Sequence, residues 1–214
     1  MTVNAESSQI GRAPVGWRFW GQWLLASTIG FAISCIVALV GATLGGFVLA
    51  LGGFASVSGG FTLALALAGI DIGAMVGILQ WLLMRRHVQA SGWWILASAA
   101  GACVAFALGL AITGAGNGAW VLGAIVGGVV GGAALGALQW LLLRKVVDQS
   151  QMWFWIAASA VAWALNLLFM AVAVNSAASA AVPGTGIVNV IIAGIVGALV
   201  ASAVTGYALM RIMR

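Results

Sequence analysis

Charged side chains are scarce in this sequence. Only 5% of the 214 residues are charged, with eight Lys and Arg against three Asp and Glu, whereas a soluble domain carries about 25%. Apolar residues make up 64% of the chain, so too few polar side chains remain to cover a surface that faces water. The composition therefore excludes an ordinary soluble domain and predicts a protein surrounded mostly by lipid.

Groups that carry chemistry are equally few. The acids are Glu6, Asp71 and Asp148, and the one histidine is His87. These residues are too few and too scattered to form the nucleophile, base and acid of a hydrolase or kinase. One histidine cannot build a zinc site, and the two cysteines lie in apolar runs without further ligands. We therefore predict no enzyme activity, no metal and no obligatory cofactor.

Long apolar runs dominate the chain, and the two prolines lie outside them. The predicted spans are about 19–40, 61–84, 93–112, 120–143, 153–174 and 188–210. Each run approaches the ~20 residues that a helix needs to cross a bilayer, and only helices satisfy their backbone there. The prediction is an all-α integral membrane protein with one membrane domain, six spans and a polar tail, residues 1–18. Residues 41–60 either extend the first span or re-enter the membrane, and both interpretations stay open.

The eight cations are distributed on one side of these spans. The tail, the 85–92 and 144–152 connections and the C-terminus hold all eight Lys and Arg, and the other three connections hold none. By the positive-inside rule, both termini then face the cytoplasm. The cytoplasmic anchors are Arg85, Arg86, Arg144, Lys145 and Arg211. Because the cations flank apolar runs and form no stripe, we predict the bilayer as the partner and no binding of nucleic acid.

The chain repeats one helical hairpin three times, as residues 19–86, 87–145 and 146–214. The first span of each begins with Trp-x-x-x-Ser, at Trp23, Trp94 and Trp155. The second span ends with Gln-Trp and a cation at Gln80 and Gln139, 59 residues apart, and with Gly-Tyr in the last copy. Repeats of one orientation are related by an axis along the membrane normal. We therefore predict a pseudo-threefold bundle of parallel-oriented hairpins, with 41–60 as an insertion in the first and an open row of hairpins as the alternative.

Small residues recur every four positions inside the spans and so line single helix faces. The glycines at these positions are Gly73, Gly77, Gly101, Gly109, Gly123, Gly127, Gly128, Gly131, Gly132 and Gly136. Lipid provides no hydrophobic drive between helices, so close backbone packing must hold them together. We expect the third and fourth spans to pack at short distance.

Asp71 stands out because it lies midway along the second span, where an ionisable group is expensive and by default suggests function. The first interpretation is a protonated carboxyl hydrogen-bonded to Asn166, which lies near the midplane of the fifth span. The alternatives are a transport or proton-coupling site, a cavity shared by lipid and water, and a contact with another subunit.

Gln80 and Gln139 are the other recurring polar residues within the membrane. Each is interpreted as an amide that fixes a helix end or bonds between spans, with a ligand for a pigment metal or a lipid headgroup as the alternative. The eleven tryptophans cluster at span ends, as in an aromatic belt. A pigment or quinone pocket is the second interpretation.

The ending Gly-x-x-Gln-Trp-Leu-x-x-Arg occurs at residues 77–85 and 136–144, and Trp-Trp-x-Leu-Ala-Ser follows at 93–98. This combination resembles uncharacterised multi-pass membrane proteins of cyanobacteria and filamentous green bacteria. The resemblance covers about four of the predicted spans and implies a bacterial inner or photosynthetic membrane, without an activity. The leading hypothesis is a non-enzymatic structural or accessory subunit of a larger photosynthetic or respiratory membrane complex. A small transporter using Asp71 and a pigment-binding protein are the alternatives.

Overall fold

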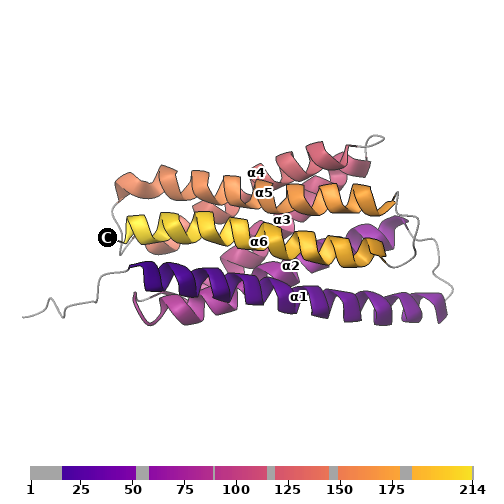
Figure 1. Cartoon of the computed structure of the whole chain (residues 1–214), viewed down its shortest axis with the longest axis horizontal. Coiled ribbons are helices and arrows are strands. Elements are labelled where there is room, and N and C mark those ends of the chain that lie inside the picture. The colour runs from indigo at the N-terminus through magenta and orange to yellow at the C-terminus, as the bar shows by residue number, and fades with distance from the viewer. Residues whose placement is uncertain are drawn as a thin grey trace, which may run out of the picture.

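The computed structural model describes residues 16–51, 58–88, 90–114, 119–144, 149–178 and 185–213. Within these ranges the chain is helical and contains no strand (Figure 1). The α-helices are α1 Trp17–Leu51, α2 Ser58–Met84, α3 Trp93–Gly114, α4 Trp120–Leu143, α5 Met152–Ala178 and α6 Thr185–Ile212, and a 3-10 turn, Gln149–Gln151, precedes α5. In the described part of the chain, six helices are long and apolar enough to cross a bilayer. The prediction of an all-α, multi-pass membrane protein is confirmed at this level.

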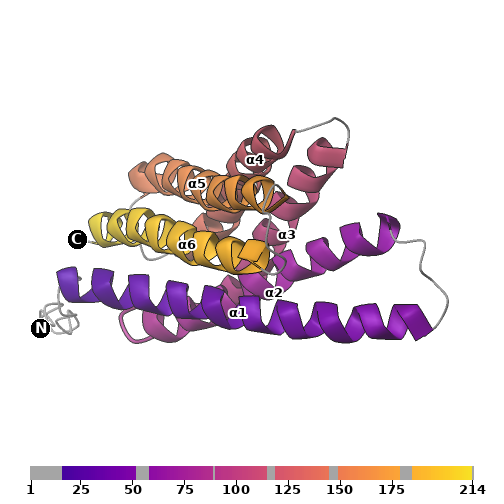
Figure 2. The same cartoon turned by 45° about the vertical axis from the view of Figure 1, so that its right-hand side comes forward.

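The first helix is longer than the span predicted for it. It runs unbroken for 35 residues, about 52 Å at 1.5 Å per residue, which exceeds a hydrocarbon core of ~30 Å. Residues 42–51 therefore extend the first span and do not re-enter, and Figure 2 shows α1 continuing past the end of α6. Gly45-Gly46 does not end the helix, because glycine lowers helix propensity without forbidding the helix. The tail predicted as residues 1–18 is also shorter, since α1 begins at Trp17.

The helices form a closed ring in chain order. Each helix packs against its neighbours in sequence, and α6 packs against α1 (Figures 1 and 2). An open row of hairpins is therefore excluded. The starts of α1, α3 and α5 and the ends of α2, α4 and α6 share one hydrophobic cluster, which includes Trp23, Trp94, Trp140 and Leu209.

The same end of the bundle carries the arginines of the described ranges, and we call it the arginine end. They are Arg18, Arg85, Arg86, Arg144 and Arg211. Lys145, also predicted as an anchor, lies outside the described residues. Arg85 packs its guanidinium 4.9 Å from the centre of the Trp81 ring, a cation–π contact. An aromatic side chain therefore supports this cation at the rim of the bundle.

Helix α4 presents one glycine stripe to α3 and another to α5. A Cβ placed on Gly127 would lie 2.7 Å from the backbone nitrogen of Gly109 in α3, and one on Gly132 would lie 2.6 Å from the carbonyl oxygen of Ser159 in α5. Real Cβ atoms essentially never approach so closely, so a larger residue would push the helices apart. The stripe facing α3 is Gly123, Gly127 and Gly131, and the stripe facing α5 is Gly128, Gly132 and Gly136. The predicted close packing of the third and fourth spans is confirmed.

The remaining predicted packing glycines also lie at helix contacts. Gly73 and Gly77 face α3, where a Cβ on Gly77 would lie 2.9 Å from that of Ser98. On α3 itself, Gly101 faces Leu135 of α4, while Gly109 faces Gly123. These contacts place backbone against backbone around much of the ring and fix the positions of the polar side chains inside it.

Candidate functional site

Three buried tryptophans lie in contact inside the arginine end. Trp23, Trp94 and Trp155 come from the first two turns of α1, α3 and α5, and each is only 1% exposed. The ring centres of Trp23 and Trp94 are 6.3 Å apart, and those of Trp94 and Trp155 are 6.2 Å apart. The aromatic-belt prediction is wrong for these residues, because their indole rings pack on one another inside the ring of helices. It fits their exposed neighbours Trp93 and Trp153 better.

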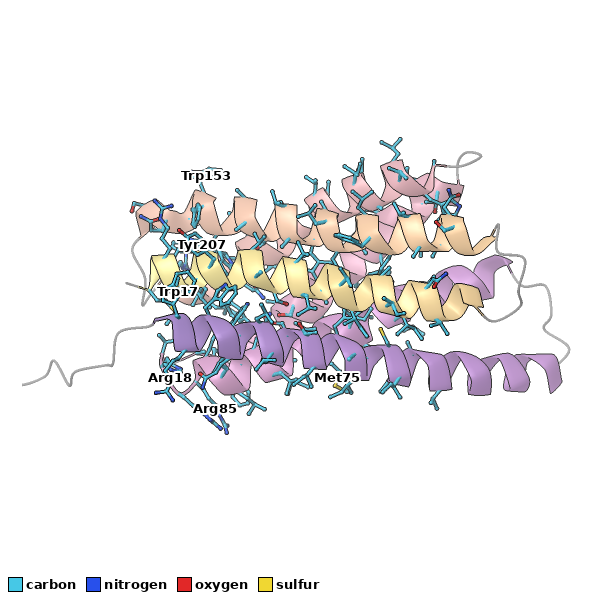
Figure 3. All side chains as sticks on the ribbon, viewed as in Figure 1. Trp17, Arg18, Met75, Arg85, Trp153 and Tyr207 are labelled. Atoms are coloured by element: carbon cyan, nitrogen blue, oxygen red, sulfur yellow. The ribbon has the colours of Figure 1, made fainter. Side chains whose placement is uncertain are left out.

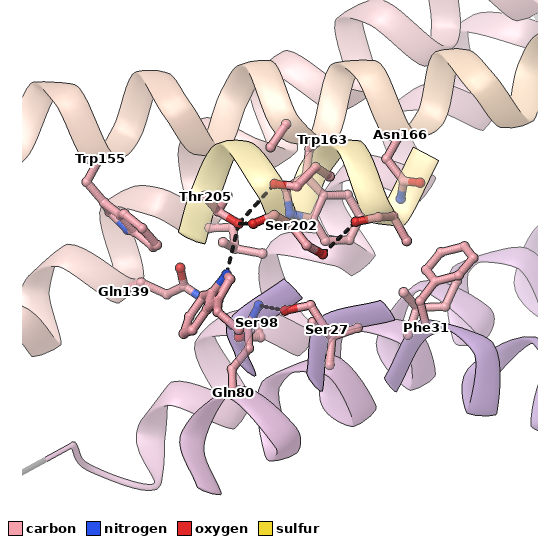
Figure 4. A pocket seen from close by; sticks show the side chains of 18 residues that line it. Ser27, Phe31, Gln80, Ser98, Gln139, Trp155, Trp163, Asn166, Ser202 and Thr205 are labelled. Atoms are coloured by element: carbon pink, nitrogen blue, oxygen red, sulfur yellow. Dashed lines mark hydrogen bonds between the residues drawn. The ribbon is translucent and has the colours of Figure 1, made fainter. Parts of the chain in front are cut away.

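Gln80 links three helices through its side-chain amide. Its Nε2 donates to Ser27 Oγ of α1 at 3.0 Å, and its Oε1 accepts from Trp94 Nε1 of α3 at 3.2 Å (Figure 4). Gln139 of α4 makes the matching first bond, since its Nε2 donates to Ser98 Oγ of α3 at 2.9 Å. Both glutamines are buried and act as bonds between spans, the first interpretation drawn from the sequence.

The serines that accept these bonds were not identified as site residues from the sequence. The signal that could have found them is the Trp-x-x-x-Ser spacing, which puts tryptophan and serine on one helix face. Ser98 Oγ also donates to the carbonyl oxygen of Trp94, four residues earlier, at 2.9 Å. Its hydroxyl is therefore oriented to accept from Gln139, and the two spans are tied together.

Helix α6 lacks this glutamine, and Gly206 stands at the aligned position of the sequence. A Cβ on Gly206 would lie 2.7 Å from Trp23 Cδ1, so the indole of Trp23 occupies the space of a larger side chain. Trp23 Nε1 instead donates to Thr205 Oγ1 at 3.1 Å. On α5, Trp155 Nε1 and Ser159 Oγ are buried and have no hydrogen-bond partner within the described residues. The hydrogen bonds of the repeated Trp, Ser and Gln side chains are therefore complete around Gln80 and incomplete on α5.

A small cavity of about 60 Å³ lies at the centre of the ring (Figure 4). Side chains that line it include Ser27, Gln80, Gln139, Trp155 and Asn166, and no charged residue is found among the described residues around it. A space of this size is large enough to admit water. The cavity is polar but far smaller than the ~300–1,000 Å³ of small-molecule sites.

Asp71 does not line this cavity. It lies beside α1, where Ser34 Oγ is 3.5 Å from the Asp71 carbonyl oxygen. The predicted hydrogen bond between Asp71 and Asn166 is not observed, because neither Asp71 Oδ2 nor Asn166 Oδ1 has a partner in the described ranges. The reason is direction: Asn166 faces the cavity and Gly197 of α6, whereas Asp71 lies at the contact of α2 with α1. The sequence matched the two residues by their positions along the spans, but such a position does not fix the helix face that a side chain occupies.

The remaining reactive side chains are dispersed. His87 Nδ1 lies 3.1 Å from the carbonyl oxygen of Leu83, and its ring packs edge-on against Phe19 with centres 5.0 Å apart. Cys35 and Cys103 are free thiols. In the described ranges, no three His, Cys, Asp or Glu side chains gather where they could hold a metal ion. No protein-family model, curated protein or solved structure matches the chain.

Proposed function

We propose that the chain is built from three copies of one hairpin around a pseudo-threefold axis. Equivalent contacts support this arrangement. Gly73 packs on Ser98 between α2 and α3, and Gly132 packs on Ser159 between α4 and α5, at offsets of 59 and 61 residues that match the sequence repeat. Inside the first two hairpins, Gly30 faces Val76 in the same way as Gly101 faces Leu135.

This bundle serves, in our proposal, as a non-enzymatic accessory subunit of a larger membrane complex. The proposal rests on one observation: the polar side chains inside the bundle bond the helices to one another. The amides of Gln80 and Gln139 join helices to one another, and the central cavity measures only about 60 Å³. An interior that holds its helices together and has no room for a metabolite leaves the outer surface as the part available for interaction.

The arginine end faces the cytoplasm in this proposal, in a bacterial inner or photosynthetic membrane. The support is the positive-inside rule together with the position of the described arginines at one end of the bundle. A cysteine at Ser91, an exposed residue between α2 and α3, reports the orientation in a variant that lacks Cys35 and Cys103. An impermeant maleimide should label it in inverted vesicles and not in right-side-out cells.

Proton-coupled transport is the second candidate, and one observation favours it. Asp71 Oδ2 is buried without a hydrogen-bond partner among the described residues, and an unpaired ionisable group at membrane depth marks many ion paths. Asp71 does not line the central cavity, which argues against a route through the ring. In this candidate function, the proton or ion moves along the contact of α1 and α2.

Purification from native membranes in mild detergent tests the accessory role. The expected result is a particle larger than the monomer with a partner polypeptide at fixed stoichiometry. A monomer without a partner, combined with uptake into proteoliposomes that is lost in Asp71→Asn, would establish the transport candidate instead. Visible absorbance that remains with the purified chain at fixed stoichiometry would favour the pigment-binding alternative.

A further inference from the structure

An apolar groove of about 690 Å³ runs along α6 between α1 and α5, near the arginine end. Its walls are Trp17 and Trp20 of α1 and Phe154, Ala157, Ala158 and Val161 of α5, and its floor is Ala203, Val204, Tyr207 and Ala208 of α6. The groove opens outward, since Trp17, Tyr207 and Val161 on its edges are 64%, 46% and 51% exposed. Figure 3 shows Trp17 and Tyr207 close together at this end of the bundle. The space is more than ten times that of the central cavity.

Substitutions of the repeated residues explain why the groove opens at α6. Ala157 aligns with Leu25 and Leu96 of the earlier hairpins, and both leucines are exposed. Ala208 follows Gly206-Tyr207 where Leu82 and Leu141 follow the two Gln-Trp pairs. Ala157 is exposed on the wall of the groove and leaves open the space that a leucine would cover, whereas Ala208 is buried in the floor.

The tryptophan wall is held in place by its own contacts. Trp20 Nε1 donates to the carbonyl oxygen of Ala203 on α6 at 3.0 Å, and Trp17 packs edge-on against Trp20 with ring centres 5.7 Å apart. Because the indole is tied to the floor of the groove, it cannot rotate in to fill the space without losing that bond. The groove is therefore built into the α1–α6 contact.

A cation lies beside the groove at the arginine end. Arg211 follows Tyr207 by four residues and so continues the same face of α6. Its guanidinium lies 5.1 Å from the centre of the Phe154 ring, which lines the groove. The side chain is exposed, and no carboxylate pairs with it in the described part of the chain. An apolar channel that ends at an exposed arginine is complementary to an amphiphile with an anionic head.

We propose that this groove binds one anionic phospholipid, with an acyl chain along α6 and the phosphate at Arg211. The volume falls within the ~300–1,000 Å³ of small-molecule sites. An acyl chain is already in hydrocarbon when it lies in the bilayer, so burial gives it little preference for the groove. The preference must come from the head group, and a single arginine near the membrane surface favours an anionic lipid by about fivefold.

Native mass spectrometry of the full chain with phosphatidylglycerol and phosphatidylcholine of identical acyl chains tests the proposal. We expect one adduct per chain and about fivefold preference for phosphatidylglycerol. Arg211→Gln should remove the preference, while Arg144→Gln, at the aligned position on α4, should retain it. Ala157→Trp, which fills the groove from its exposed wall, should abolish the adduct. Leu96→Trp, at the aligned position on α3, should leave it unchanged.

Equal binding of the two lipids, or an adduct that survives both Arg211→Gln and Ala157→Trp, would overturn the proposal. A photocrosslinker at Tyr207 gives a second measurement in native membranes. Crosslinking to phospholipid supports the site, whereas crosslinking to a polypeptide at fixed stoichiometry would show that a partner helix occupies the groove. Unchanged thermal unfolding of each variant establishes that the bundle is intact, so the lipid result does not depend on the accessory role.

Discussion

Replacing each interior glutamine with leucine should cost unequal amounts of stability. Gln80 makes two bonds between helices, donating to Ser27 at 3.0 Å and accepting from Trp94 at 3.2 Å. Gln139 donates to Ser98 at 2.9 Å, while Trp155 Nε1, aligned with Trp94 Nε1, has no partner in the described residues. The sequence repeat therefore supplies a matched pair of variants that differ by one hydrogen bond.

The size of the difference follows from bonds measured between membrane helices, which average about 0.6 kcal/mol each and reach ~1.7. Gln80→Leu removes two such bonds, so we expect the free energy of unfolding to fall by about 1.2 kcal/mol, with an upper limit near 3.4. Gln139→Leu removes one and should lower it by about 0.6 kcal/mol. Leucine has a shorter side chain than glutamine, with fewer heavy atoms, so neither change should force the helices apart.

Reversible unfolding in mixed detergent micelles, or steric trapping in bicelles, measures both values. Gln22→Leu is the control, because Gln22 lies on the exposed side of α1 and surface changes usually stay within about 0.5 kcal/mol. Equal losses for the two interior variants, or a greater loss for Gln139→Leu, would show that the amide network does not hold the helices as described.

Two further variants test the packing and the buried acid. Gly127→Leu should prevent folding or lower the thermal midpoint sharply, since its Cβ would meet the Gly109 backbone at 2.7 Å. Gly41→Leu, with nothing within 4 Å of its Cβ, should unfold like the wild type, and equal midpoints for both would refute close packing of α3 and α4. Asp71→Asn should leave the free energy of unfolding unchanged or raise it by up to about 3 kcal/mol, because an acid in mid-membrane is costly. A clear loss of stability in that variant would mean that the carboxylate has a stabilising partner.

The spans, the helix faces that pack and the grouping of the described arginines at one end were predictable from the sequence. Lipid permits few structures, so an apolar run of sufficient length must be a helix. Glycines at four-residue spacing then define a face, and Gly127 and Gly132 show that two such faces on α4 serve two neighbours. These predictions needed only rules that act within one helix.

Predictions that depend on contacts between helices succeeded less well. Asp71 and Asn166 were matched by depth, although Asn166 lines the central cavity and Asp71 does not. The tryptophans at span starts were assigned to the membrane interface, whereas Trp94 is buried and bonded to Gln80. In each case the sequence gives the height of a residue along the bundle, but only the ring of neighbours decides whether it points inward.

Closing the ring requires the last helix, α6, to pack against the first, α1. The helices of the first two hairpins do not have to make this contact. Gly132 and Gly136 let α4 approach α5 closely, but Leu199 and Ala203 occupy the aligned positions on α6. Larger side chains then separate α6 from α1, and two indoles span the distance, Trp20 to Ala203 and Trp23 to Thr205. The missing glutamine and the outer groove both adjoin this contact. A chain built from sequence repeats can therefore have a distinct site where the repeat is interrupted. We expect the function of this protein to reside at the contact of α1 with α6.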